Sequence, residues 1–118
     1  MTILVVEDNA DILFAMGALL ENEGYVVQKA ENGLVGLDLV SKHGEPDLIL
    51  LDMMMPVMDG GRFLEAFREK FQSKTPIVIM SALADAEHRA RELGVNGWIG
   101  KPFVFDELLP LIKKHLEK

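Results

Sequence analysis

The strongest constraint on the fold is a repeated alternation between short apolar runs and longer amphipathic stretches. The apolar runs are rich in β-branched and aliphatic residues and are too short for buried helices, so they predict strands. These runs are Ile3–Val6, Tyr25–Val27, Leu48–Leu51, Ile77–Met80 and Trp98–Ile99. After each run, apolar residues recur at helical spacing and predict helices over Asp11–Asn22, Gly33–His43, Gly60–Phe71, Ala84–Leu93 and Phe105–Leu116.

This alternation predicts an α/β fold of the doubly wound, flavodoxin-like kind, with a five-stranded parallel sheet and five helices. Three runs (ILVV, LILL and IVIM) are uninterrupted, as is typical of strands covered on both faces. The second run turns polar early and the fifth is very short, so both are expected at the sheet edges. The order 2-1-3-4-5 satisfies both constraints. Without a linker, repeat or low-complexity tract, residues 1–118 are expected to form a single domain.

Composition and charge exclude several classes of protein. The chain has no cysteine, so disulfides, thiol nucleophiles and cysteine-ligated metal centres are ruled out. A net charge of −7 argues against direct contact with nucleic acid, which is bound through clustered lysine and arginine. No apolar stretch approaches the roughly 20 residues of a bilayer span, and the N-terminus lacks the basic segment of a signal peptide. We therefore expect a cytoplasmic globular protein without a membrane partner.

Polar side chains follow four of the five predicted strands. Glu7 and Asp8 follow the first, Asp52 the third, Ser81 the fourth and Lys101 the fifth. In open α/β sheets, ligands bind at the carboxyl ends of the strands where the strand order reverses, which here lies between the first and third strands. Three carboxylates, one hydroxyl and one amine are therefore expected to converge in one crevice.

Three carboxylates cannot gather there without a counter-charge. Two like charges about 4 Å apart repel by roughly 1 kcal/mol in water and roughly 4 kcal/mol at an effective dielectric near 20. One lysine is not enough, and an oxygen-only ligand set beside a strand end suits Mg²⁺ best. With Lys101 opposite, the pattern predicts a phosphoryl-transfer site whose nucleophile is the carboxylate of Asp52.

Each of these residues also has a simpler interpretation. Asp8 is in a position to cap the following helix, Ser81 to occupy a turn, and Lys101 to be a solvated surface lysine. Asp59, directly before the third helix, is a better helix cap than Asp52. The coincidence of four such groups at strand ends favours the functional interpretation.

The chain resembles the receiver domain of two-component response regulators, of the stand-alone kind seen in chemotaxis. The resemblance covers residues 3–117, and its motifs are Glu7-Asp8, the segment from Leu48 to Gly60 (LILLDMMMPVMDG), and Lys101-Pro102-Phe103. Together, in this order and at these spacings, the three motifs are specific. The family's fold has the strand order given above.

The resemblance implies a role for each site residue. Asp52 would accept a phosphoryl group from a sensor histidine kinase or a histidine phosphotransfer protein. Mg²⁺ would be held directly by Asp8, largely through water by Glu7, and also by Asp52 and the backbone carbonyl of Met54. Lys101 would pair with Asp52 before transfer and with a phosphoryl oxygen afterwards. The Lys101–Pro102 bond would be cis.

The resemblance also implies a phosphorylation-dependent switch rather than an enzyme with a separate substrate. Ser81 would move toward the phosphoryl group, and the aromatic side chain of Trp98 would then rotate inward. The surface formed by the fourth helix, the fifth strand and the fifth helix would bind a downstream protein target. The protein would be a monomer or a weak dimer linked to phosphorylation, and its chemistry would be limited to its own phosphorylation and dephosphorylation.

Several features depart from the family pattern. Glu7 stands where Asp is more common, Ser81 where Thr is more common, and Trp98 is bulkier than the usual Tyr or Phe. Pro110 falls inside the last helix, where it removes one backbone hydrogen bond. Arg89 and Arg91 follow Asp85 and Glu87 by four positions, which predicts two solvated ion pairs.

Three other functions compete with this interpretation. A flavin-binding module would need a glycine- or hydroxyl-rich phosphate loop where Glu7 and Asp8 stand. A phosphatase of the haloacid dehalogenase type would need a second aspartate where Met54 stands. The remaining alternative is a receiver-shaped protein-interaction module that is not phosphorylated.

Overall fold

The structure, a computed structural model, describes residues 1–55, 57–82 and 84–116. Five parallel strands form one sheet in the order β2-β1-β3-β4-β5, and five helices connect them, as the sequence predicts. The strands are β1 (Thr2–Val6), β2 (Val26–Ala30), β3 (Leu48–Asp52), β4 (Ile77–Ala82) and β5 (Gly97–Lys101). The helices are α1 (Ala10–Asn22), α2 (Gly33–His43), α3 (Gly60–Phe71), α4 (Ala86–Leu93) and α5 (Phe105–Leu116).

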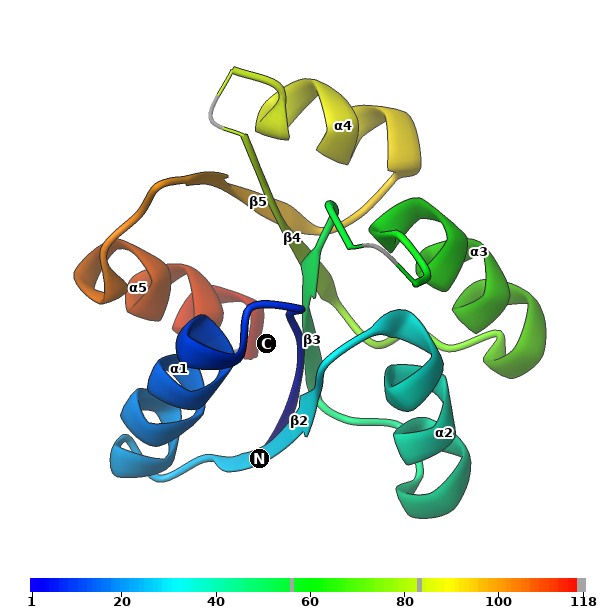
Figure 1. The fold of residues 1–118 in the computed structure, drawn as a ribbon, viewed down its shortest axis with the longest axis horizontal. Coiled ribbons are helices and arrows are strands. Elements are labelled where there is room, and N and C mark those ends of the chain that lie inside the picture. The colour runs from blue at the N-terminus through cyan, green and yellow to red at the C-terminus, as the bar shows by residue number, and fades with distance from the viewer. Residues whose placement is uncertain (56, 83, 117–118) are drawn as a thin grey trace.

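Helices cover both faces of the sheet. Figure 1 shows α1 and α5 on one face and α2 and α3 on the other, with α4 near β4 and β5. Alternate residues of β3 lie on opposite faces of the sheet. Leu48 and Leu50 pack toward α1 and α5, whereas Ile49 and Leu51 pack toward α2, α3 and α4. This double burial is the reason that the central strands are apolar without interruption.

The edge strands and α4 differ from their predicted bounds. β2 begins at Val26 rather than Tyr25 and continues to Ala30, because an edge strand tolerates polar residues such as Lys29. β5 runs from Gly97 to Lys101 and is longer than Trp98–Ile99, because its two glycines carry no apolar signal yet pair with β4. α4 begins at Ala86 rather than Ala84.

Local sequence signals set the helix ends. Asn9, Asn32 and Asp59 cap α1, α2 and α3 by accepting a backbone N–H three residues ahead. The predicted cap at Asp59 is therefore confirmed, whereas α1 is capped by Asn9 and not by Asp8. Gly94 ends α4 in the left-handed conformation, which glycine adopts readily.

The C-terminal part of the chain contains a proline inside a helix and a cis peptide bond. α5 continues through Pro110, and the Lys101–Pro102 peptide bond is cis, as the family resemblance implies. Pro56 of the phosphoacceptor-like segment and residues 117–118 lie outside the described residues. None of the described helices has the length and apolar character needed to cross a bilayer.

Candidate functional site

The carboxyl edge of the sheet brings together the acidic residues that the sequence predicts there. Glu7 follows β1 directly, Asp52 is the last residue of β3, and Asp8 lies next to Glu7 at the start of the loop to α1. Each contributes a carboxylate oxygen to a group whose ligand atoms all lie within 4.8 Å of one another. Glu7 and Asp52 are buried, with 1% and 2% of their surfaces exposed, whereas Asp8 is exposed.

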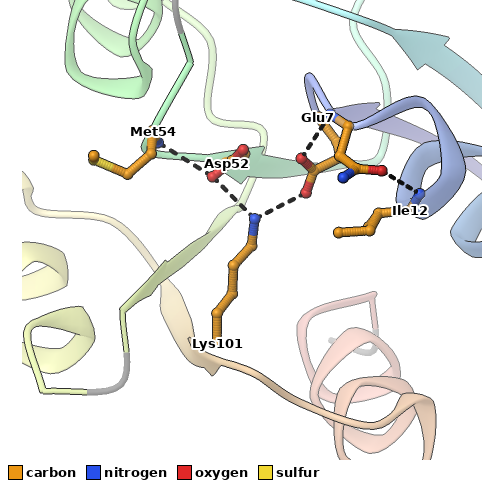
Figure 2. Close-up of polar contacts among 6 residues, drawn as sticks. Glu7, Ile12, Asp52, Met54 and Lys101 are labelled. Carbon is orange, nitrogen blue, oxygen red and sulfur yellow. Dashed lines mark hydrogen bonds and ion pairs between the residues drawn. The ribbon is translucent and has the colours of Figure 1, made fainter.

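Lys101 bridges the two buried carboxylates. Its ammonium nitrogen lies 3.0 Å from Oε1 of Glu7 and 3.2 Å from Oδ1 of Asp52. Figure 2 shows the lysine side chain extending from the end of β5 to a point between these two residues. The sequence predicts the approach of Lys101 to Asp52, but its shorter contact with Glu7 emerges only from the structure.

Backbone groups hold both carboxylates in place. The N–H of Met54 donates to Oδ1 of Asp52 at 3.1 Å, and the N–H of Asn9 donates to Oε2 of Glu7 at 3.1 Å. Glu7 thus uses one oxygen for Lys101 and the other for the backbone at the start of α1 (Figure 2). A glutamate has one more methylene than an aspartate, and this extra reach allows the carboxylate to meet both groups.

The electrostatics of the site favour protonation of Asp52 in the absence of a metal ion. The pKa of Asp52 is raised from 3.8 to about 7, chiefly by burial and in smaller part by the neighbouring Asp8 and Glu7, while the Met54 N–H opposes the shift. For Lys101, burial lowers the pKa, but the carboxylates of Glu7 and Asp52 outweigh burial and the pKa is raised above 10.5. The lysine therefore remains charged across the physiological pH range.

The remaining predicted site residues lie around this cluster. Ser81 is 5% exposed and lies in β4, one residue beyond Met80, which pairs with Asp52. Met54 follows Asp52 by two residues, and its side chain is 75% exposed at the rim. Trp98 lies on β5 opposite Ile79 and is 39% exposed.

The donor set fits a hard divalent cation. Three carboxylates supply oxygen ligands, and one of them, Asp8, faces solvent, where an ion can enter and keep several waters. Lys101 supplies only one positive charge against the three carboxylates. A bound cation of charge +2 removes this deficit.

The contacts of Arg89 differ from the sequence prediction. Arg91 forms the predicted ion pair with Glu87, but no ion pair joins Arg89 to Asp85 within the described ranges. Arg89 instead lines a hollow of about 500 Å³ together with Asp59 and the three methionines that follow Asp52. Helical spacing alone does not reveal this, because Asp85 is the residue directly before α4.

An apolar hollow of about 270 Å³ lies on the other side of Lys101. It is lined from α1 by Ile12, Ala15, Met16 and Leu19, and from the β5–α5 segment by Lys101, Pro102, Phe103 and Phe105. Lys101 thus contributes both to the carboxylate cluster and to this apolar surface.

Known proteins are similar to this chain over nearly its whole length. The family model of the response regulator receiver domain matches residues 3–113. Sporulation initiation phosphotransferase F of Bacillus subtilis is 36% identical over 116 residues, which is 97% of this chain and 92% of that protein. The transcriptional regulatory protein CusR of Escherichia coli is also 36% identical, but this chain spans only 52% of its length.

Solved structures show the same fold. Chemotaxis protein CheY4 of Vibrio cholerae matches with a TM-score of 0.86 and 32% sequence identity, over 96% of each chain. The receiver domain of NtrX from Brucella abortus matches with a TM-score of 0.87 and 28% identity, over 98% of each chain.

Proposed function

Since this chain belongs to the response regulator receiver domain family, we propose that residues 1–118 form one receiver unit whose Asp52 accepts a phosphoryl group. The observation that carries the proposal is the pairing of buried Asp52 with Lys101, at 3.2 Å, beside two further carboxylates. This arrangement provides a nucleophile, a cation and a metal-ligand set in one crevice.

The reaction is a displacement at phosphorus. One carboxylate oxygen of Asp52 forms a bond to the phosphorus atom while the bond from phosphorus to the donor nitrogen of a phosphohistidine breaks. The donor imidazole leaves with the bonding electron pair and takes up a proton. Asp52 must be ionised to attack, and both the positive charge of Lys101 and the N–H of Met54 favour the ionised form.

Mg²⁺ is the cofactor proposed for this site, held by Asp8, Glu7, Asp52 and the backbone carbonyl of Met54. When bound, it supplies positive charge that lowers repulsion between these carboxylates and the phosphoryl oxygens. Lys101 then pairs with a phosphoryl oxygen, and the hydroxyl of Ser81 donates to another. Ser81 moves toward the phosphoryl group, Trp98 turns inward, and the face formed by α4, β5 and α5 changes shape for a downstream protein.

The phosphodonor is proposed to be a protein, either a sensor histidine kinase or a histidine phosphotransfer protein. The apolar hollow between α1 and the β5–α5 segment supports this, because it adjoins Lys101 and offers apolar surface to a partner that presents its histidine to Asp52. The transcriptional regulators among the relatives are about twice as long as this chain.

Intact-mass measurement after incubation with Mg²⁺ and phosphoramidate, a small phosphodonor, tests the proposal. The wild-type protein should gain the mass of one phosphoryl group, and Asp52→Asn should gain none. Asp59→Asn is the matched control, because Asp59 lies in the same loop and asparagine retains the capping oxygen of α3. Absence of an adduct on the wild-type protein would instead favour a receiver-shaped interaction module.

A further inference from the structure

We propose that Arg89 is a second cation of the phosphoryl site, which stabilises the phosphorylated state from the far side of the loop that follows Asp52. The inference rests on the proposed function and adds a residue to it. Arg89 comes from α4 and belongs to none of the three motifs on which the family resemblance depends.

The surroundings of Arg89 distinguish it from the other basic residues of α4. His88 lies 3.5 Å from Glu92, and Arg91 pairs with Glu87, each through the ordinary four-residue spacing of a helix. Arg89 is partly buried, and its guanidinium has no ion pair or hydrogen bond to any residue that the structure describes. A partly buried charge without a partner costs free energy, so an anion placed within its reach is stabilised.

The hollow lined by Arg89 adjoins the segment that follows the phosphoacceptor, and Asp59 lines it as well. Met53, Met54 and Met55 form one wall, and they are the three residues directly after Asp52. In Figure 1, the segment after β3 rises beside α3 and toward α4, which carries Arg89. A volume of about 500 Å³ leaves the long arginine side chain room to change its rotamer.

Charge balance indicates why a second cation is useful. Three carboxylates, one ammonium group and one divalent ion sum to zero formal charge. A phosphoryl group on Asp52 carries about 1.5 to 2 negative charges and replaces the single charge of the carboxylate. Phosphorylation therefore leaves an uncompensated negative charge, because the single positive charge of Lys101 is already counted in this sum. Arg89 supplies the missing positive charge.

Calorimetric titration with beryllofluoride and Mg²⁺, a stable mimic of the phosphoryl group, tests this role. Arg89→Gln should weaken beryllofluoride binding by about three- to tenfold at low salt, and the loss should shrink as salt screens the charge. Arg89→Lys, which keeps the positive charge, should retain most of the wild-type affinity for beryllofluoride. Arg91→Gln is the matched control, with the same change of charge on the same helix, and should stay within about twofold of wild type.

Titration with Mg²⁺ alone separates this role from a structural one. Removing a positive charge near the carboxylates should leave Mg²⁺ affinity unchanged or increase it, whereas a disturbed site would lose affinity for both Mg²⁺ and beryllofluoride. Equal behaviour of Arg89→Gln and Arg91→Gln, or a parallel loss of both ligands, would overturn the inference. A wild-type protein that binds neither beryllofluoride nor a phosphoryl group would overturn the proposed function itself.

Discussion

The ammonium nitrogen of Lys101 lies 3.0 Å from Oε1 of Glu7, which joins the end of β5 to the residue after β1 across 94 positions of sequence. Asp52 is 3.2 Å from the same nitrogen, so one cation serves two buried carboxylates. Breaking a buried pair by removing one partner leaves an uncompensated charge, which costs far more than the loss of an exposed pair. Lys101 therefore both stabilises the metal-free site and competes with any cation that binds there.

Replacement of Lys101 by methionine should separate these two effects. In EDTA at pH 8, Lys101→Met should lower the free energy of unfolding by on the order of 2 kcal/mol, because Glu7 and Asp52 lose their shared cation. The same variant should bind Mg²⁺ several-fold more tightly, since a competing positive charge is gone. Denaturant unfolding and calorimetry measure the two quantities. Lys42→Met, which removes an exposed pair with Asp38, is the control and should change stability by less than about 1 kcal/mol.

Asp52→Asn should stabilise the metal-free protein at alkaline pH. Because burial raises the pKa of Asp52 from 3.8 to about 7, the folded state binds a proton there that the unfolded state has released. The stability of the wild-type protein should therefore fall as pH rises from about 4 to 7 and stay lower above that. The variant cannot ionise, so its advantage should be on the order of 4 kcal/mol at pH 8 and should vanish near pH 4. Urea unfolding at both pH values, with EDTA present, decides the question, and an equal advantage at both would contradict the buried-acid explanation.

Removal of divalent ions should destabilise the protein measurably. A ligand that binds only the folded state stabilises it by about 2.7 kcal/mol at 100 times its dissociation constant. Thermal unfolding with Mg²⁺ should therefore show a higher midpoint than unfolding with EDTA, and Asp8→Asn should lose most of this difference. Asp11→Asn, an exposed acid in the first turn of α1, should retain it. A wild-type midpoint that does not respond to Mg²⁺ would argue against a metal site.

Gly60 and Gly61 should respond oppositely to alanine, although they are adjacent residues at the start of α3. A Cβ atom at Gly60 would lie 2.8 Å from the backbone oxygen of Asp52 and 2.8 Å from Cα of Met53, so the loop beside the phosphoacceptor must shift. Gly60→Ala should lower the free energy of unfolding by about 2 kcal/mol and weaken Mg²⁺ binding. A Cβ atom at Gly61 would meet only Oδ1 of Asp59, at 3.4 Å. Gly61→Ala should therefore leave the free energy of unfolding unchanged or raise it by up to about 1 kcal/mol. Similar losses for both would show that the contact at Gly60 is not the cause.

The fluorescence of Trp98, the only tryptophan, should report the switch. Its side chain is 39% exposed, so inward rotation would transfer the indole from water to an apolar environment. Addition of beryllofluoride and Mg²⁺ should shift the emission maximum to shorter wavelength. An unchanged spectrum under conditions where calorimetry proves binding would exclude Trp98 from the conformational change.

The sheet order and the place of the site follow from local features of the sequence. The continuous apolar run of β3 indicates burial on both faces, whereas the polar residues of β2 indicate an edge, and the observed strand order agrees with both indications. Asp52 could be located in the same way, because a polar residue at the end of a buried parallel strand must face the carboxyl edge of the sheet. A weak signal misled the prediction at β5, where the two glycines carry no apolar signal. At Asp8 the structure removes the simpler interpretation as a helix cap, because the adjacent Asn9 caps α1.

The sequence by itself therefore determined the architecture and the list of groups at the site, because periodicity and strand ends depend on neighbours along the chain. Only the tertiary structure decided how these groups interact: that Lys101 is shared between Glu7 and Asp52, that burial raises the pKa of Asp52, and that Arg89 turns toward the methionines after β3 instead of pairing with Asp85. Electrostatic energies depend on distance and on exposure to water, and both are set by contacts between residues far apart in sequence.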